Sequence, residues 1–309
     1  MTLVTCNERM AVGLMSLQFF VFVYFCSKFE QLIDKVGAIC FNYSMYEKYF
    51  GLAELPFRVT PDPRFLWYSE QHQSAKEKIL YHITQSIGPL YLLADVGTGK
   101  TTLARRIMEE LSSSARYQIV FAPSPNLKTT NAFLRFVMEE FEVKTARSYA
   151  RCLKNFERFL VEQKQAGKSP VLLIDEAQNM SRDMLLLIQH LFNFSTNTEF
   201  LVQMVLFGQL EFQPKLDRLP SLKSRLNIAK LKPLDRLQTG EMMKFRWTVA
   251  GGHELPFSEE AIDEIYAFTR GIPRTIVLLA HEALIRAAVS GKKYVEKGET
   301  AAAQAELTV

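Results

Sequence analysis

The stretch "LLADVGTGKTTLARRI", residues 92–107, decides the fold of this chain. It joins a short apolar run to a helical pattern in which Leu103, Ile107 and Leu111 recur every four residues. The loop between them matches G-x-x-x-x-G-K-S/T except at the first position, where Ala94 replaces glycine. A strand, a glycine loop ending in Lys-Thr and an amphipathic helix, in this order, predict a phosphate-binding loop rather than an ordinary turn.

The chemistry of this loop suits a nucleoside triphosphate with Mg²⁺. Glycines allow successive backbone N–H groups to turn toward phosphate oxygens, and a lysine adds a positive charge beside the β- and γ-phosphates. The hydroxyl that follows the lysine completes a Mg²⁺ shell. Alanine is the smallest possible change at the strand exit, so we expect the site to be retained. The predicted binding segment is Ala94, Asp95, Val96, Gly97, Thr98, Gly99, Lys100, Thr101 and Thr102.

A second half of the site is predicted 75 residues beyond Lys100 (175 minus 100), in "VLLIDEAQ", where Asp175 and Glu176 follow four apolar residues. Asp175 would hold Mg²⁺ through its water shell. Glu176 would orient and deprotonate the attacking water. Acidic residues at strand ends are often merely solvated, but the loop upstream favours a functional pair. The pair predicts hydrolysis by water rather than phosphoryl transfer to a small substrate.

The chain organisation is predicted from its apolar runs. Those at 89–94, 117–122, 170–176 and 200–208 are nearly continuous, as in parallel strands that are buried on both faces, and helical patterns separate them. After Pro233 only helical periodicity remains, which predicts a second, all-helical domain. The predicted divisions are an apolar N-terminal segment at 1–44, a flanking segment at 45–88, an α/β domain at 89–232, a helical lid at 233–291 and a C-terminal tail at 292–309.

The composition is that of a folded globular protein, with 48% hydrophobic and 23% charged residues among 309. The net charge of +4 does not by itself imply a strongly polyanionic partner. The four cysteines show no C-x-x-C spacing, which argues against a disulfide scaffold and a zinc site. This pattern is typical of a reducing compartment, so we expect a cytoplasmic location.

The N-terminal segment differs from the remainder. Residues 10–26, "MAVGLMSLQFFVFVYFC", form an apolar run broken only by Ser16 and Gln18. A bilayer span needs about 20 apolar residues, so the run is borderline as a span. Three interpretations compete: a short membrane anchor, a helix packed on the body, and upstream sequence translated from a misassigned start. The third is favoured because ordinary composition resumes at Met45. Membrane association through residues 10–26 is the close alternative.

Three further side chains are candidates to sense or stabilise the γ-phosphate, where negative charge develops during transfer. Gln209 follows the fourth apolar run, and Arg225 precedes a predicted short strand from which it would reach a neighbouring subunit. Arg274 begins a helix of the predicted lid and would fold onto the phosphates when the lid closes. Arg218 competes with Arg225 for the role toward the neighbouring subunit.

The motifs together resemble those of the AAA+ ATPases, in the branch of ExeA (general secretion pathway protein A), which lies near the transposition ATPases of the TniB and TnsC type. The resemblance runs from about residue 46 to residue 289. It includes "YFGLAELPFRVTPDPRFLWYSEQH" ahead of the loop, then "VGTGKTTLARRI", "LLIDEAQNMS", "VLFGQLEF", "SRL" and "GIPR". The segment ahead of the loop is the most diagnostic of the branch, because the other motifs recur across AAA+ proteins.

This resemblance implies a parallel sheet ordered 5-1-4-3-2, a helical lid, and ATP with Mg²⁺ at their junction. It also implies Gln209 as sensor 1, Arg225 as arginine finger and Arg274 as sensor 2. Residues 56–67 would help to enclose the adenine. Members of this kind act as homo-oligomeric rings or filaments, so the first expected partner is another copy of the chain.

The biological process is less constrained than the ATPase chemistry. Secretion members resemble a longer design in which a membrane span and a peptidoglycan-binding domain follow the ATPase, whereas this chain ends 20 residues after Val289 (309 minus 289). A DNA-transposition helper that binds double-stranded DNA and recruits a transposase is therefore the first expectation. A secretion-assembly ATPase with secretion-machinery partners is the alternative. A non-hydrolysing scaffold and a small-molecule kinase are less favoured. The candidate DNA-contacting cations are Arg105, Arg106, Lys128, Arg147 and Lys154.

Overall fold

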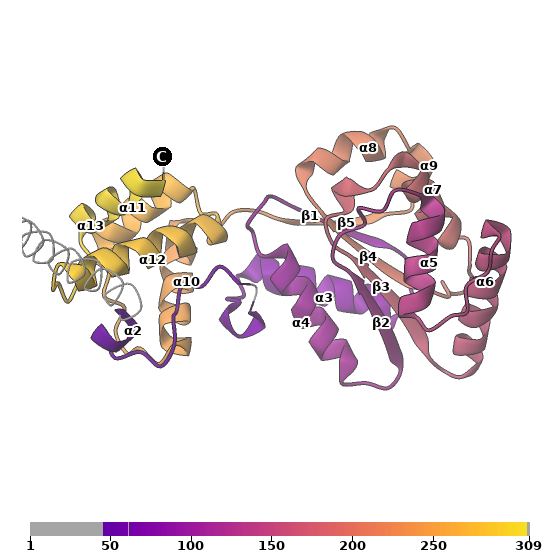
Figure 1. The fold of residues 1–309 in the computed structure, drawn as a ribbon, viewed down its shortest axis with the longest axis horizontal. Helices are drawn as coiled ribbons and strands as arrows, with labels where there is room; N and C mark the ends of the chain where they lie inside the picture. The colour runs from indigo at the N-terminus through magenta and orange to yellow at the C-terminus, as the bar shows by residue number, and fades with distance from the viewer. Residues whose placement is uncertain (1–45, 61, 308–309) are drawn as a thin grey trace, which may run out of the picture.

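A computed structural model of the chain describes residues 46–60 and 62–307. A sheet flanked by helices lies at one end of the molecule and a group of helices at the other, with two crossings of the chain between them (Figure 1). The predicted anchor at 10–26 and the resumption of ordinary composition at Met45 fall outside the described residues. No helix of the described part is long and apolar enough to cross a bilayer.

The sheet has five strands, and every hydrogen-bonded pair in it is parallel. Its order is β2-β3-β4-β1-β5, which is the predicted 5-1-4-3-2 order followed from the other edge. The resemblance is therefore confirmed at the level of topology. The strands are β1 (Leu90–Ala94), β2 (Tyr117–Ala122), β3 (Ser169–Ile174), β4 (Gln203–Gly208) and β5 (Asn227–Leu231).

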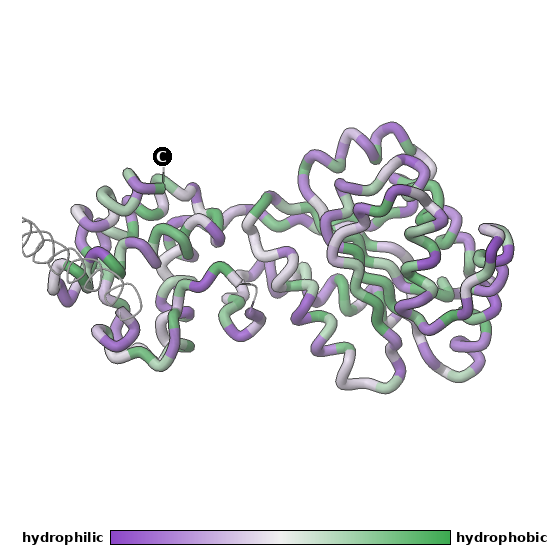
Figure 2. Tube along the Cα trace, viewed as in Figure 1, coloured by the Kyte–Doolittle hydropathy of each residue, from purple (hydrophilic) through white to green (hydrophobic). Residues whose placement is uncertain are grey.

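Helices cover both faces of the sheet, which explains why its strands read as continuous apolar runs. Helices α3 (Glu70–Thr84) and α4 (Lys100–Ser112) pack on one face. Helices α5 (Thr130–Glu140), α6 (Tyr149–Gln165) and α7 (Arg182–Leu191) pack on the other. All five residues of β1 are buried, and the strands appear green in the hydropathy view (Figure 2).

Short elements carry the chain across the ends of the central strands. Helix η2 (Ala177–Asn179) follows β3. Helices η3 (Leu210–Phe212), α8 (Gln213–Asp217) and α9 (Pro220–Lys223) lie between β4 and β5. Helices η2 and η3 follow the carboxyl ends of β3 and β4, where ligands of open α/β sheets bind.

Four helices follow β5, as the loss of strand signal after Pro233 predicts. They are α10 (Arg236–Val249), α11 (Glu259–Thr269), α12 (Pro273–Val289) and α13 (Lys297–Leu307). Ser258 caps α11 by accepting a hydrogen bond from the Ala261 N–H at 3.2 Å, which its position in the sequence anticipates.

Helix α13 lies in the segment that was expected to be a tail, residues 292–309. It packs against α11 and α12, with Thr300 and Ala303 buried. Its apolar face consists mainly of alanines, so its hydrophobic periodicity is weak. A pattern search that depends on large apolar residues therefore misses it.

The described part of the segment ahead of the sheet begins beside the lid and then crosses to the sheet (Figure 1). Helix α2 (Tyr46–Tyr49) and the 3₁₀ helix η1 (Pro63–Phe65) belong to this segment. Its buried residues Leu52 and Phe57 join one apolar cluster with lid residues such as Met243 and Leu284. The flanking segment is therefore built into the core of the lid.

Candidate nucleotide site

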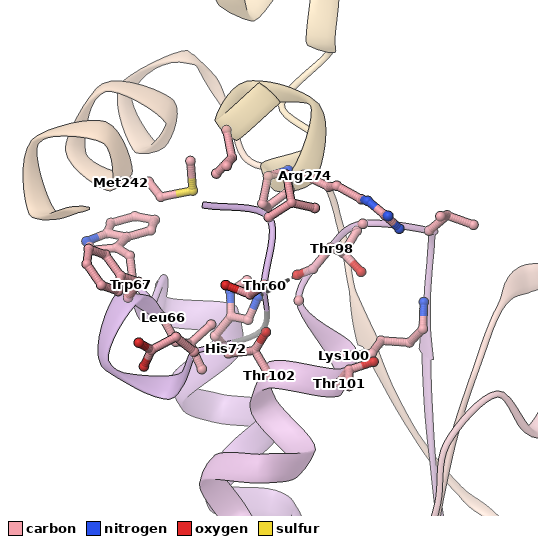
Figure 3. Close-up of a pocket in the computed structure, with 18 of the residues that line it drawn as sticks. Thr60, Leu66, Trp67, His72, Thr98, Lys100, Thr101, Thr102, Met242 and Arg274 are labelled. Carbon is pink, nitrogen blue, oxygen red and sulfur yellow. Dashed lines mark hydrogen bonds between the residues drawn. The ribbon is translucent and has the colours of Figure 1, made fainter. Parts of the chain in front are cut away.

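A cavity of about 290 Å³ lies where the carboxyl ends of the strands face the lid. Trp67 and Met242 lie toward one end of it, and Lys100 and Thr101 toward the other (Figure 3). The aromatic and apolar side chains gather at the first end, which suits a base, and the glycine loop lies at the other, which suits phosphates. The lining on the loop side comprises Val96, Gly97, Thr98, Gly99, Lys100, Thr101, Thr102, Glu176, Gln209 and Arg274.

The loop has the backbone conformation that its glycines predict. Gly97 and Gly99 have φ values of 79° and 98°, in the left-handed region that side chains with a Cβ rarely adopt. Gly99 is the N-cap of α4 and provides no side-chain cap, so the first N–H groups of the helix face the cavity as donors for an anion. Ala94 lies in β1 and has no positive φ, so its methyl group is accommodated without strain.

Lys100 is 5% exposed and bends back over the loop that precedes it. Its Nζ donates to the carbonyl oxygens of Ala94 at 2.9 Å and Asp95 at 2.7 Å. Burial lowers the pKa of Lys100, while Glu176 and Asp175 act in the opposite direction. Its acceptors are carbonyls rather than carboxylates, so within the described part of the chain the ammonium has no counter-ion in contact. A phosphate group entering the cavity would provide one.

The structure brings the loop and the acidic couple together. Thr101 Oγ1 donates to Asp175 Oδ2 at 2.6 Å, and the backbone N–H of Glu176 donates to Asp175 Oδ1 at 2.9 Å. Burial raises the pKa of Asp175, so its charged form is destabilised in the absence of a cation. Strands β1 and β3 are not neighbours, and the two clusters meet across the end of β4. A hydroxyl and a buried carboxylate in contact are a donor set that fits Mg²⁺.

Glu176 is held by two amide side chains. Gln178 Nε2 and Gln209 Nε2 both donate to Glu176 Oε2, the second at 3.1 Å. Gln178 Oε1 also accepts from the backbone N–H of Gln209 at 3.2 Å, which ties the end of β3 to the end of β4. Glu176 itself has a φ of 51°, and a non-glycine residue in that region stores strain of the kind that occurs at functional sites.

Gln178 was not singled out from the sequence, although it stands in the quoted "LLIDEAQNMS". Lys215 of α8 was not predicted from the sequence either. Its Nζ donates to the Gln178 carbonyl at 2.6 Å and to the Met180 carbonyl at 3.2 Å, fixing the turn that carries Gln178. No periodicity or spacing in the sequence points to either residue, because each acts through a contact between the segment that follows β3 and the segment that follows β4.

Arg274 lies directly above the loop, at the beginning of α12 (Figure 3). Its backbone N–H donates to the Gly97 carbonyl at 3.1 Å. A Cβ at position 97 would lie 2.8 Å from the Arg274 Cβ, so only glycine permits this approach of the lid. The structure therefore places the predicted sensor of the lid against the predicted phosphate cradle.

Arg225 and Arg218 are both exposed and do not belong to the described residues that line the cavity. Arg225 Nη1 donates to Asn193 Oδ1 at 2.6 Å, just before β5. An arginine that contacts the nucleotide of a neighbouring subunit has to lie outside the nucleotide cavity of its own subunit. The assignment of Arg225 to that role stays a prediction.

His72 is another lining residue that the sequence did not reveal. Its Nε2 lies 3.0 Å from the Thr98 carbonyl oxygen, and its Nδ1 lies 2.7 Å from Ser69 Oγ. Burial lowers the pKa of His72, which favours the neutral imidazole that can donate to that carbonyl. The side chain braces the phosphate loop from helix α3. The N-cap spacing from Ser69 to His72 was the only local signal.

Comparisons with known proteins agree with this geometry. Residues 83–216 match the AAA domain family. General secretion pathway protein A of Aeromonas hydrophila is 32% identical over 269 residues, which cover 85% of this chain and 49% of that protein. The chain thus spans about half the length of that curated relative.

Solved structures share the fold at low identity. The Aeropyrum pernix ORC1 protein in complex with DNA has a TM-score of 0.58 and 19% identity, over 82% of this chain and 69% of that one. Drosophila ORC bound to DNA has a TM-score of 0.60 and 19% identity, over 77% and 60% of the two chains. The chain therefore contains an AAA domain at residues 83–216, and over 85% of its length it resembles general secretion pathway protein A.

Proposed function

We propose that the chain binds ATP with Mg²⁺ in this cavity and hydrolyses it. The observation that carries the proposal is the contact between Thr101 and Asp175, beside buried Lys100 and amide-held Glu176. Lys100 would neutralise the phosphates, and Thr101 with Asp175 would hold Mg²⁺. Glu176 would take the proton of the attacking water while Gln209 and Arg274 face the γ-phosphate.

We also propose that turnover is coupled to the assembly of a secretion machine, with other copies of the chain and secretion-machinery proteins as partners. The sequence led us to expect a transposition helper first and a secretion ATPase second. The relative named for general secretion reverses that order, because the similarity covers 85% of the chain and not only the AAA domain.

A basic stripe on α6 supports double-stranded DNA as a second candidate partner. Arg151, Lys154 and Arg158 are exposed at helical spacing on one face, and none forms an ion pair within the described part of the chain. Cations arranged in this way suit a phosphate backbone. The five cations chosen from sequence do not form one surface, because Arg105 and Arg106 lie on α4, on the other side of the sheet.

ATP turnover with and without double-stranded DNA separates these candidates. We expect Mg²⁺-dependent turnover that DNA leaves unchanged at roughly 0.1 M salt, because the protein partner rather than DNA is proposed to stimulate it. Stimulation by DNA, lost when Arg151, Lys154 and Arg158 are replaced together by alanine, would instead establish the second candidate. Transfer of phosphate to a metabolite would contradict both and indicate a kinase.

Replacing Arg225 by alanine should reduce turnover by about 10³-fold and leave ATP binding intact, because the arginine is expected to act on a neighbouring subunit. Mixing this variant with Lys100→Ala subunits should restore part of the rate, since some mixed sites then contain both groups. Turnover is measured across the mixing ratio, with Arg218→Ala in parallel. A wild-type rate in the pure Arg225→Ala protein would remove this residue from the role.

A further inference from the structure

The base-side wall of the cavity, residues 56–60 and 62–65, belongs to the lid rather than to the sheet. Phe57 and Phe65 are buried in the lid cluster, and the rings of Phe57 and Phe257 meet edge to face at 6.2 Å. The Ala53 N–H donates to the Ala250 carbonyl at 2.9 Å at the end of α10. The wall contributes Arg58, Val59, Thr60, Asp62 and Phe65 to the cavity, and Trp67 packs against the same lid cluster.

Arg246 of α10 fastens this wall. Its Nε donates to the Pro56 carbonyl at 2.9 Å, its Nη1 to the Phe65 carbonyl at 3.1 Å and its Nη2 to the Arg58 carbonyl at 2.9 Å. The guanidinium also lies over the Phe65 ring, 5.1 Å from its centre. Three hydrogen bonds from one planar group thus attach Pro56, Arg58 and Phe65 to a single helix.

The guanidinium has no counter-ion in direct contact. It forms none of the ion pairs found among residues 46–60 and 62–307, and burial lowers the pKa of Arg246 to about 10. A partly buried cation is tolerated only where fixed dipoles replace the water that it loses. The three carbonyls supply these dipoles, so the loop conformation and the burial of Arg246 depend on each other.

The phosphate side of the cavity belongs to the sheet domain rather than to the lid. The change from one body to the other falls beside Phe65, because Leu66 and Tyr68 pack with the sheet-side cluster of α3 and α4. The second crossing runs from β5 to α10, and there Gln71 forms two hydrogen bonds with the backbone of Lys232. Its Nε2 donates to the Lys232 carbonyl at 2.9 Å, and its Oε1 accepts from the Lys232 N–H at 2.8 Å. The two crossings therefore lie side by side, as in a hinge.

We infer that Arg246 is a positioning residue of the nucleotide site, which attaches the base-side wall to the lid so that base contact and lid position are coupled. The inference rests on the proposed ATP function. Through this attachment the lid carries both the wall and Arg274, so a nucleotide whose base is held by the wall draws Arg274 toward its phosphates. A ligand that consists of phosphates alone does not use the wall.

The test compares ATP with inorganic tripolyphosphate, which lacks the base. For Arg246→Met in the full chain we expect the KM for ATP to rise on the order of 10- to 100-fold, because a displaced wall no longer meets the base. The kcat at saturating ATP should change less than KM, and the Kd for tripolyphosphate should stay within about twofold of wild type. Arg246→Lys, which keeps the charge and some of its donors, should recover part of the ATP affinity.

Arg236→Met is the matched control, since Arg236 lies on the same helix but pairs with Asp263 and Glu259 away from the cavity. Equal weakening of ATP and tripolyphosphate in Arg246→Lys would mean a merely structural role and overturn the inference, as would unchanged ATP affinity in Arg246→Met. Should Arg246→Met not fold, Arg246→Lys carries the same comparison. A wild-type protein that binds neither ligand would instead overturn the proposed function.

Discussion

A Lys100→Ala variant is expected to lose nucleotide binding. Lys100 places a buried ammonium inside the phosphate loop, and no carboxylate of residues 46–60 or 62–307 contacts it. Removing one member of a buried charge pair costs roughly 2–5 kcal/mol, which lowers the affinity for ATP by about 30-fold to several thousandfold. Equilibrium binding of labelled ATP with Mg²⁺ measures this loss directly.

The control for this variant is Arg106→Ala on the same helix. Arg106 is half exposed, pairs with Glu109 and does not line the cavity, so its loss should leave ATP affinity near that of wild type. Circular dichroism and the midpoint of thermal unfolding show whether Lys100→Ala remains folded. A folded Lys100→Ala protein with wild-type affinity would refute the assignment of residues 94–102 as a phosphate cradle.

Glu176→Gln is expected to keep ATP bound and to stop its hydrolysis. A carboxamide still offers an oxygen to Gln178 and Gln209, so the hydrogen bonds that connect β3 to β4 are largely preserved. It cannot accept the proton of water, and the loss of a general base lowers the rate by about 10²- to 10⁴-fold. Release of phosphate under single-turnover conditions reports the chemical step without product dissociation.

Glu211→Gln provides the matched substitution, because Glu211 is exposed, lies two residues after Gln209 and is not part of the cavity lining. Its turnover should equal that of wild type. Unchanged hydrolysis in Glu176→Gln would exclude Glu176 as the base. Loss of ATP binding in the same variant would show that the carboxylate serves the binding of Mg²⁺ instead.

The groups of the candidate site come from two parts of the molecule, the sheet domain and the lid. Lys100, Asp175 and Glu176 belong to the sheet domain, whereas Arg274 belongs to the lid, packs against Gly97 and donates its backbone N–H to the Gly97 carbonyl. A small rotation about the two crossings would change the position of Arg274 without disturbing Thr101 and its contact with Asp175. Catalysis and lid position can thus be coupled through few residues.

The sequence by itself determined the local framework of the site. Closely spaced glycines, an apolar run ending in an acidic pair, and a lysine beside a hydroxyl are signals between neighbours in the chain, and they predicted Gly97, Gly99, Lys100, Thr101 and Asp175 as site residues. The parallel α/β architecture followed from apolar runs separated by helical patterns, and the strand order followed from the family resemblance.

Only the tertiary structure decided what surrounds that framework. Arg246 is separated in sequence by 190 residues from Pro56 and by 181 from Phe65, and Gln178 by 31 from Gln209. These contacts depend on how the lid, the flanking segment and the strand ends pack. A buried guanidinium or amide is positioned by carbonyls and side chains from distant parts of the chain, which leave no periodicity or spacing around the residue itself.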